Sequence, residues 1–146
     1  MRHLVRISNQ SQNRRVNRRR IKEAALHTLR NFAESETLID ITFVGNKKIR
    51  ALNKKYMGRD SDTDVLSFLL EESKSAKRKI IGDIYISADK ARSNASRFNT
   101  SYEKELVLYT IHGILHLLGF NDKTRKEKEE IRKIEEKMLN ETAKTY

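Results

Sequence analysis

HGILHLLGFND, residues 112–122, contains two of the four histidines of this chain, placed four positions apart. Histidines at this spacing lie on one face of a helix with Cβ atoms about 5–6 Å apart, so both imidazoles can reach one cation. Gly119 can end that helix in the left-handed conformation, and the chain can then turn back toward the histidines. The stretch predicts a metal site with His112, His116 and Asp122 as ligands. Three protein ligands leave the open coordination position of a catalytic zinc site.

The same stretch shares its spacing with the extended zincin motif, H-E-x-x-H-x-x-G-x-x-H, at both histidines and the glycine. Asp122 stands in the last ligand position. The second position differs, because Gly113 replaces the glutamate that metallopeptidases use as a general base. Each residue also has an ordinary structural interpretation, since a histidine on an apolar helix is often a packed core residue and Asp122 could cap the next helix. The combination within eleven residues favours the metal site.

The length and composition favour one domain, residues 1–146, with a single core. The chain has no cysteine, which excludes disulfides and thiolate zinc clusters, so a transition metal must be held by histidine and carboxylate. The first residues, MRHLVRISNQ, are interrupted by charges and contain no signal-peptide core, and no apolar run is long enough to span a membrane. We therefore expect a soluble, cytoplasmic protein without membrane association.

The net charge is +11, from 31 Lys and Arg against 20 Asp and Glu. Residues 1–30 alone contain nine Lys or Arg and one acid, Glu23. Such an excess predicts a polyanionic partner, which could be RNA, DNA or an anionic membrane surface, while a basic surface that only keeps the protein soluble is the alternative. The candidate substrate-binding residues in this region are Arg14, Arg15, Arg18 and Arg19.

Hydrophobic periodicity places helices and strands alternately along the chain. Strands are predicted at about residues 4–7, 38–44, 64–70 and 80–87, and helices at about residues 13–33, 47–56, 88–97, 101–118 and from 124 onward. This order predicts an α+β fold in which a small mixed sheet, with 4–7 at its edge, is packed by about five helices. The metal-binding helix is too apolar for a surface, so it should be central and buried, with its C-terminal end opening into a cleft.

Several local signals refine these elements. Residues 100–103 and 124–127 have the sequence of a capping box, so they should begin the last two helices. In helix 47–56, which should stop at Gly58, we expect Ile49, Leu52 and Tyr56 to face inward. Gly82 lies inside a strand and predicts a bulge or the close approach of another backbone. Residues 71–79 form a lysine-rich connector.

Three blocks of this sequence together resemble the YbeY family of metal-dependent endoribonucleases, the bacterial rRNA maturation factors. The blocks are LNKKYMGRDSDTDVLSF at residues 52–68, GDI at 82–84 and HGILHLLGF at 112–120. The resemblance implies an α+β enzyme with one zinc ion per chain that cleaves single-stranded RNA. It further implies a role in rRNA processing, particularly at the 3′ end of small-subunit rRNA, and in ribosome quality control. The implied partners are rRNA and the small ribosomal subunit.

The chain departs from the family pattern at two places. The family usually has a third histidine at the position of Asp122, preceded by aspartate where this chain has Asn121. A carboxylate oxygen binds zinc at about 2.0–2.2 Å, so the site can survive with its charge lowered by one. The family also has an arginine directly after the aromatic residue that corresponds to Tyr56, and this chain has Met57 there. Arg59, two residues later, is our candidate for the same catalytic role, and a solvated loop charge is the alternative.

The resulting hypothesis is hydrolysis or transesterification of an RNA phosphodiester. A metal ion can polarise a phosphate oxygen or activate water, and Arg59 can offset the charge that develops on phosphate. Asp83 is the one candidate for a general base. Two alternatives remain: an RNA- or ribosome-binding protein with a structural metal, and a small zinc metallopeptidase, against which Gly113 argues. The ligand types also suit nickel, iron or manganese.

Overall fold

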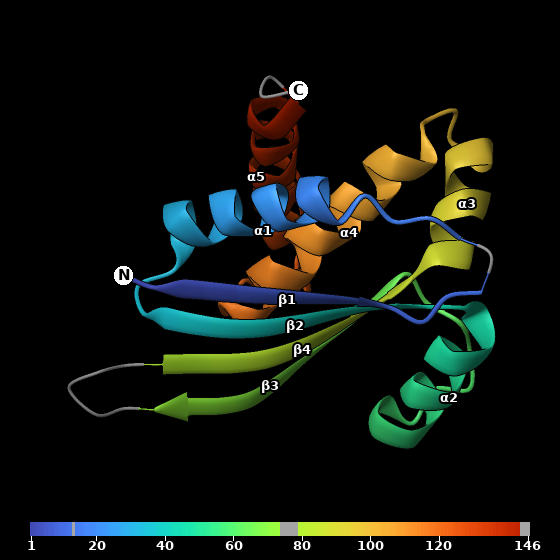
Figure 1. Ribbon diagram of the computed structural model, residues 1–146, viewed down its shortest axis with the longest axis horizontal. Helices are drawn as coiled ribbons and strands as arrows, with labels where there is room; N and C mark the ends of the chain where they lie inside the picture. Colours follow the sequence, from blue (N-terminus) through green and yellow to red (C-terminus); the bar gives the residue numbers. More distant parts are fainter. Residues whose placement is uncertain (13, 74–78, 144–146) are drawn as a thin grey trace.

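The computed structural model describes residues 1–12, 14–73 and 79–143 of the chain. In chain order the elements are β1 (His3–Asn9), α1 (Arg18–Phe32), β2 (Glu36–Val44), α2 (Asn46–Met57), β3 (Val65–Ser73), β4 (Lys79–Ser87), α3 (Ala88–Arg97), α4 (Tyr102–Leu117) and α5 (Arg125–Ala143). Within the described residues this is a single α+β domain, as the sequence predicts, with five helices packed on a mixed sheet (Figure 1). None of the helices in these residues is long and apolar enough to cross a bilayer.

The sheet has the strand order β1-β2-β4-β3. β1, β2 and β4 are parallel, and β3 pairs antiparallel with β4 at the far edge. The predicted edge position of β1 is confirmed. Alternate strand residues, among them Ile39, Ile41 and Ile84, are buried in the main core with α1, α4 and α5. These helices lie on one side of the sheet, and α2 lies beyond its other side (Figure 1).

α4 is the central helix of the fold, which confirms the prediction. It packs against α1, α3, α5, β3 and β4, and ten of its sixteen residues are buried. Gly82 on β4 allows this close packing, because a Cβ atom there would lie 2.7 Å from Cδ1 of Leu117. The bulge that the glycine also suggested lies in the neighbouring strand instead, between Leu69 and Glu71 of β3.

The ends of the last two helices are set by side-chain caps. The capping box predicted at residues 124–127 is confirmed, since Thr124 and Glu127 each accept a hydrogen bond from the backbone N–H of the other. The box predicted at 100–103 is not formed, and a single cap one residue later takes its place. Ser101 caps α4 by accepting from the N–H of Lys104 at 3.1 Å, while the Thr100 hydroxyl donates to the Glu105 carboxylate.

α1 is shorter than the predicted helix of residues 13–33. It begins at Arg18, because the Asn17 side chain accepts a hydrogen bond from the N–H of Arg20 and caps the helix there. Residue 13 lies outside the described residues, and 14–17 are not helical. The connector predicted at 71–79 is also shorter, since β3 continues to Ser73 and β4 begins at Lys79, and its remainder, 74–78, lies outside the described residues.

Candidate metal centre

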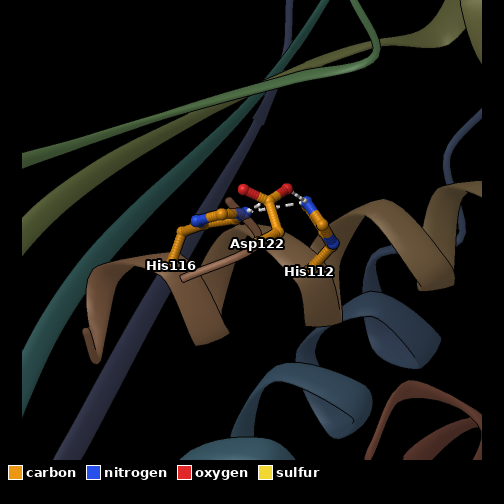
Figure 2. A group of neighbouring side chains, drawn as sticks. All are labelled: His112, His116 and Asp122. Atoms are coloured by element: carbon orange, nitrogen blue, oxygen red, sulfur yellow. Dashed lines mark hydrogen bonds and ion pairs between the residues drawn. The ribbon is translucent and has the colours of Figure 1, made fainter. Parts of the chain in front are cut away.

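Three side chains converge at the C-terminal end of α4 (Figure 2). The Nε2 atoms of His112 and His116 are 2.8 Å apart, and Oδ2 of Asp122 lies 3.5 Å from the His116 Nε2 and 3.9 Å from that of His112. Two ligand atoms bound to a tetrahedral zinc ion at about 2.0–2.1 Å are roughly 3.3 Å apart. Shifts of about half an ångström would therefore let the three atoms bind one ion. Among the described residues, this is the group that could hold a metal.

The turn after α4 brings Asp122 to the histidines. Gly119 takes the left-handed conformation, with φ of 97°. Its N–H donates to the carbonyl of His116 at 3.1 Å, and the N–H of Phe120 donates to that of Leu115 at 3.0 Å, which is the Schellman arrangement. The Phe120 ring then packs edge-on against Phe32 of α1. The predicted glycine-ended helix is confirmed, and this turn fixes the direction in which the chain returns.

Glu135, on α5, is a site residue that the sequence reasoning missed. Its carboxylate accepts a hydrogen bond from Nδ1 of His112, and its side chain is largely buried. A hydrogen bond at one imidazole nitrogen fixes the ring orientation and leaves the other nitrogen free for a metal. A signal was present, because Glu135 lies four residues after Ile131 and three before Met138, which are both buried. An acid on the apolar face of a helix requires a polar partner in the core.

The pKa values of the two histidines are shifted in opposite directions. Burial lowers the pKa of His112, but the hydrogen bond and charge of Glu135, with the charges of Asp64 and Asp122, outweigh it and raise that pKa. Burial and the neighbouring His112 lower the pKa of His116, despite Asp122 and Glu135. His116 therefore favours the neutral form, which binds metals. At His112 a metal ion competes with a proton, and this competition grows as the pH falls, so metal affinity should be lower at low pH.

The three side chains line an open cleft of about 490 Å³ between α4, the start of β3 and the loop that follows α2. Arg59 lines the same cleft, so the structure brings the predicted catalytic arginine together with the three predicted metal ligands. The neighbouring loop acids are neutralised, since Asp60 pairs with Arg50 at 2.8 Å and Asp62 with Lys90 at 3.6 Å. Within the described residues Arg59 makes no ion pair, and its charge is available to a ligand in the cleft.

The four N-terminal arginines do not line this cleft. Arg14 pairs with Asp89 at 3.3 Å, Arg18 donates to the Ile7 carbonyl and Arg19 pairs with Glu23 at 3.2 Å. The backbone of Arg15 accepts a hydrogen bond from the hydroxyl of Tyr102, at the first residue of α4. Ten residues of helix separate Tyr102 from His112, which is about 15 Å at 1.5 Å per residue. Arg15 therefore lies near the other end of α4, away from the metal ligands.

Of the two carboxylates Asp83 and Asp64, Asp64 alone lines the cleft. Asp83 alternates with the buried Gly82 and Ile84 of β4, so it faces the side of the sheet away from α4 and does not line the cleft. Burial and the Asp40 charge raise the pKa of Asp83. The structure thus does not bring this suggested base to the histidines. Asp64 does line the cleft, with Oδ1 held by the N–H of Val65 at 2.8 Å, and sequence reasoning missed it.

Gly113 faces the sheet, which allows a test of the metallopeptidase alternative. A Cβ atom there would lie 2.9 Å from Cγ2 of Ile84 and 3.1 Å from the Ser67 hydroxyl. We expect Gly113→Glu to lower the free energy of unfolding by on the order of 3 kcal/mol, because overpacking and a buried carboxylate both destabilise. Urea denaturation would measure this, with Asn121→Glu as an exposed control. Wild-type stability together with new peptidase activity in Gly113→Glu would instead support the metallopeptidase.

The contact between Glu135 and His112 predicts an effect on metal affinity. Glu135→Gln keeps the shape of the side chain and removes its charge, so the His112 imidazole is less basic and less firmly oriented. We expect zinc affinity to fall about 10- to 100-fold, as for other residues that hydrogen-bond a ligand. Competition with a chromophoric chelator measures this, and Glu136→Gln, at an exposed neighbouring position, should bind zinc as the wild type does. Equal affinities of both variants would show that Glu135 does not tune the site.

Comparisons with known proteins agree with this fold and site. Residues 6–143 match the family model described as Endoribonuclease YbeY. The chain is 39% identical over 110 residues to the Endoribonuclease YbeY of Bacillus subtilis (strain 168), and 41% identical over 110 residues to that of Bacillus licheniformis, each match covering 70% of both chains. The solution structure of TM1509 from Thermotoga maritima superimposes with a TM-score of 0.63 at 28% identity, covering 97% of this chain and 93% of that one. The resemblance expected from the three sequence blocks is confirmed, and the chain belongs to the Endoribonuclease YbeY family.

Proposed function

We propose that this protein is a zinc-dependent endoribonuclease specific for single-stranded RNA. One observation carries the proposal, namely that His112, His116 and Asp122 share a cleft with Arg59. A cation site beside a free guanidinium suits a substrate with a negatively charged phosphate. The names of the relatives and the net charge of +11 support RNA as that substrate.

In the proposed site each residue has a separate task. His112, His116 and Asp122 hold one zinc ion, which when bound would act as a Lewis acid toward a phosphate oxygen. Arg59 binds a second oxygen of the same phosphate and offsets the charge that develops there. Asp64 accepts the proton of the attacking hydroxyl, which comes from water or from the 2′ position of the RNA. As the new P–O bond forms, the P–O bond to the leaving sugar oxygen breaks, and that oxygen takes up a proton from water.

The size of the cleft supports the preference for single strands. A volume of about 490 Å³ is that of a site for a small molecule, and it admits a phosphate with its adjoining sugar. Unpaired RNA can bend one phosphate into a site of this size, whereas the backbone of a duplex is held in place by its second strand. Unpaired segments of RNA are therefore the expected substrates.

The alternative of a structural metal fits the geometry less well. The side chains of His112, His116 and Asp122 are 26%, 29% and 44% exposed, so an ion there would face the cleft. α4 is already held on its other sides by apolar packing against the sheet and three helices. A fold secured in this way does not need a metal crosslink at one end of the helix.

The wider role that we propose is maturation of rRNA, particularly at the 3′ end of small-subunit rRNA, together with ribosome quality control in the cytoplasm. Family membership supports this role. The surface formed by Arg14, Arg15, Arg18 and Arg19 would contact rRNA of the small subunit away from the scissile phosphate. Its distance from the cleft suits a contact that holds the particle and does not take part in the chemistry.

Cleavage of defined oligonucleotides tests the activity. We expect the zinc-loaded protein to cut an end-labelled single-stranded RNA and to spare the same sequence as a duplex or as DNA. A chelator should abolish cutting, and added zinc should restore it. Failure to cut any single-stranded RNA, or cutting that persists without a metal, would contradict the proposal.

A further inference from the structure

Tyr56 occupies an unexpected place at the end of α2. The sequence predicts that it faces inward with Ile49 and Leu52, but Tyr56 is 57% exposed. The helix runs past the small apolar cluster that buries Ile49, so the Tyr56 ring has one aromatic partner among the described residues. That partner is Phe68 of β3, with ring centroids 5.4 Å apart, and Phe68 in turn contacts Tyr85 at 6.0 Å. Phe68 holds the ring from one side, and the rest of the ring faces solvent and the Lys55 side chain.

The surroundings of this ring are strongly basic. α2 contains five Lys or Arg residues and no acid, and the side-chain nitrogen of Lys55 lies 5.2 Å from the centroid of the Tyr56 ring. Arg50 and Lys54 are engaged with Asp60. The other three, Lys47, Lys48 and Lys55, are exposed and make no ion pair with the described part of the chain.

This surface borders the cleft at Met57 and at the edge strand β3. Met57, directly after Tyr56, lines the cleft, and so does Ser67, directly before Phe68. The aromatic pair therefore lies just around the edge strand β3 from the metal ligands. An extended strand whose phosphate sits at Arg59 would place a neighbouring base over this edge.

We propose that the open side of Tyr56 is a stacking subsite for one base of single-stranded RNA, with Lys55 and Lys48 binding the adjoining phosphates. The inference rests on the proposed nuclease function and extends it to how the substrate is held. A fixed aromatic ring flanked by unpaired lysines is how proteins bind single strands without reading their sequence. Any base can stack in this way, so the subsite should give affinity and little sequence preference.

The test is RNA affinity of the zinc-loaded full chain, measured by fluorescence anisotropy with a labelled 2′-O-methyl oligoadenylate. A matching oligomer without bases serves as the second probe. We expect Tyr56→Ala to weaken oligoadenylate binding about tenfold and to leave binding of the abasic probe unchanged, while Tyr56→Phe binds both as the wild type does. Lys48→Ala with Lys55→Ala should lower the salt dependence, the slope of log K against log salt, by about 1.4, since each single-strand phosphate contact accounts for about 0.7.

Phe98 provides a matched control. Like Tyr56, it is exposed, at 59%, and has a basic side chain near its ring, that of Arg97 at 5.3 Å. Phe98 follows the C-terminal end of α3, however, and α3 contacts α2 at its N-terminal end, through Asp89, so Phe98 lies away from α2. Phe98→Ala should leave RNA affinity unchanged. Equal oligoadenylate affinity of Tyr56→Ala and wild type, or an equal loss on both probes, would overturn the subsite. A wild type that binds with this Tyr56 dependence but never cuts RNA would instead overturn the nuclease function alone.

Discussion

His116→Ala is expected to lower RNA cleavage by at least about a thousandfold and to leave RNA affinity within about twofold of wild type. The metal would lose one of three ligands, and Lewis-acid stabilisation is worth several kcal/mol, with each 1.4 kcal/mol equal to a factor of ten in rate. Binding should persist, because the basic and aromatic surfaces on α1 and α2 do not include His116. Cleavage of labelled RNA and fluorescence anisotropy measure the two quantities on the same samples.

His27→Ala is the matched control for this experiment. His27 lies on α1, where its ring is 3.4 Å from the Glu141 carboxylate of α5, and it does not line the cleft. We expect this variant to cleave and bind as the wild type does. If His116→Ala instead lost its fold and its RNA affinity together, the metal would be structural and the nuclease mechanism would be wrong.

Arg59→Ala is expected to lower kcat about 10²- to 10³-fold with unchanged zinc content. Removal of one preorganised group that stabilises developing charge has an effect of this size. Arg59→Lys should retain part of the rate, because it keeps the charge and loses the bidentate geometry of the guanidinium. Single-turnover cleavage measures the rate constant of the chemical step, which should fall by the same factor as kcat if chemistry limits the rate. Arg92→Ala, on the exposed side of α3, is the control.

A second substitution distinguishes the two positions from which an arginine could reach the phosphate. Met57 lines the same cleft as Arg59, so Met57→Arg placed in the Arg59→Ala variant should restore a substantial part of kcat. That recovery would show that Arg59 supplies the charge that the family pattern places at position 57. A wild-type rate for Arg59→Ala alone would show that Arg59 is only a solvated loop charge.

The sequence predicts that His112, His116 and Asp122 come together, because all three lie within eleven residues. Local rules are sufficient there: helical spacing aligns His112 with His116, and the left-handed Gly119 turns the chain. The strand pattern and the apolar character of residues 101–118 likewise predict the mixed sheet and the buried central helix. In each case the information is contained in one continuous segment.

What the sequence does not show depends on contacts between distant segments. Glu135 meets His112 only because α5 packs across α4, and Asp83 is excluded from the cleft only by the strand register. Tyr56 has the helical spacing of a core residue, but the cluster beneath α2 ends before its last turn. The start of α1 differs from the predicted one for a local reason, since Asn17, within a run of arginines, caps the helix there.

Elemental analysis of untagged protein, purified without chelators beside Asp122→Ala, tests the central claim most directly. The proposed site predicts close to one zinc ion per wild-type chain and a clearly reduced content in Asp122→Ala. A wild-type protein that holds no metal and binds none on titration with zinc would contradict the metal site and the cleavage mechanism built on it.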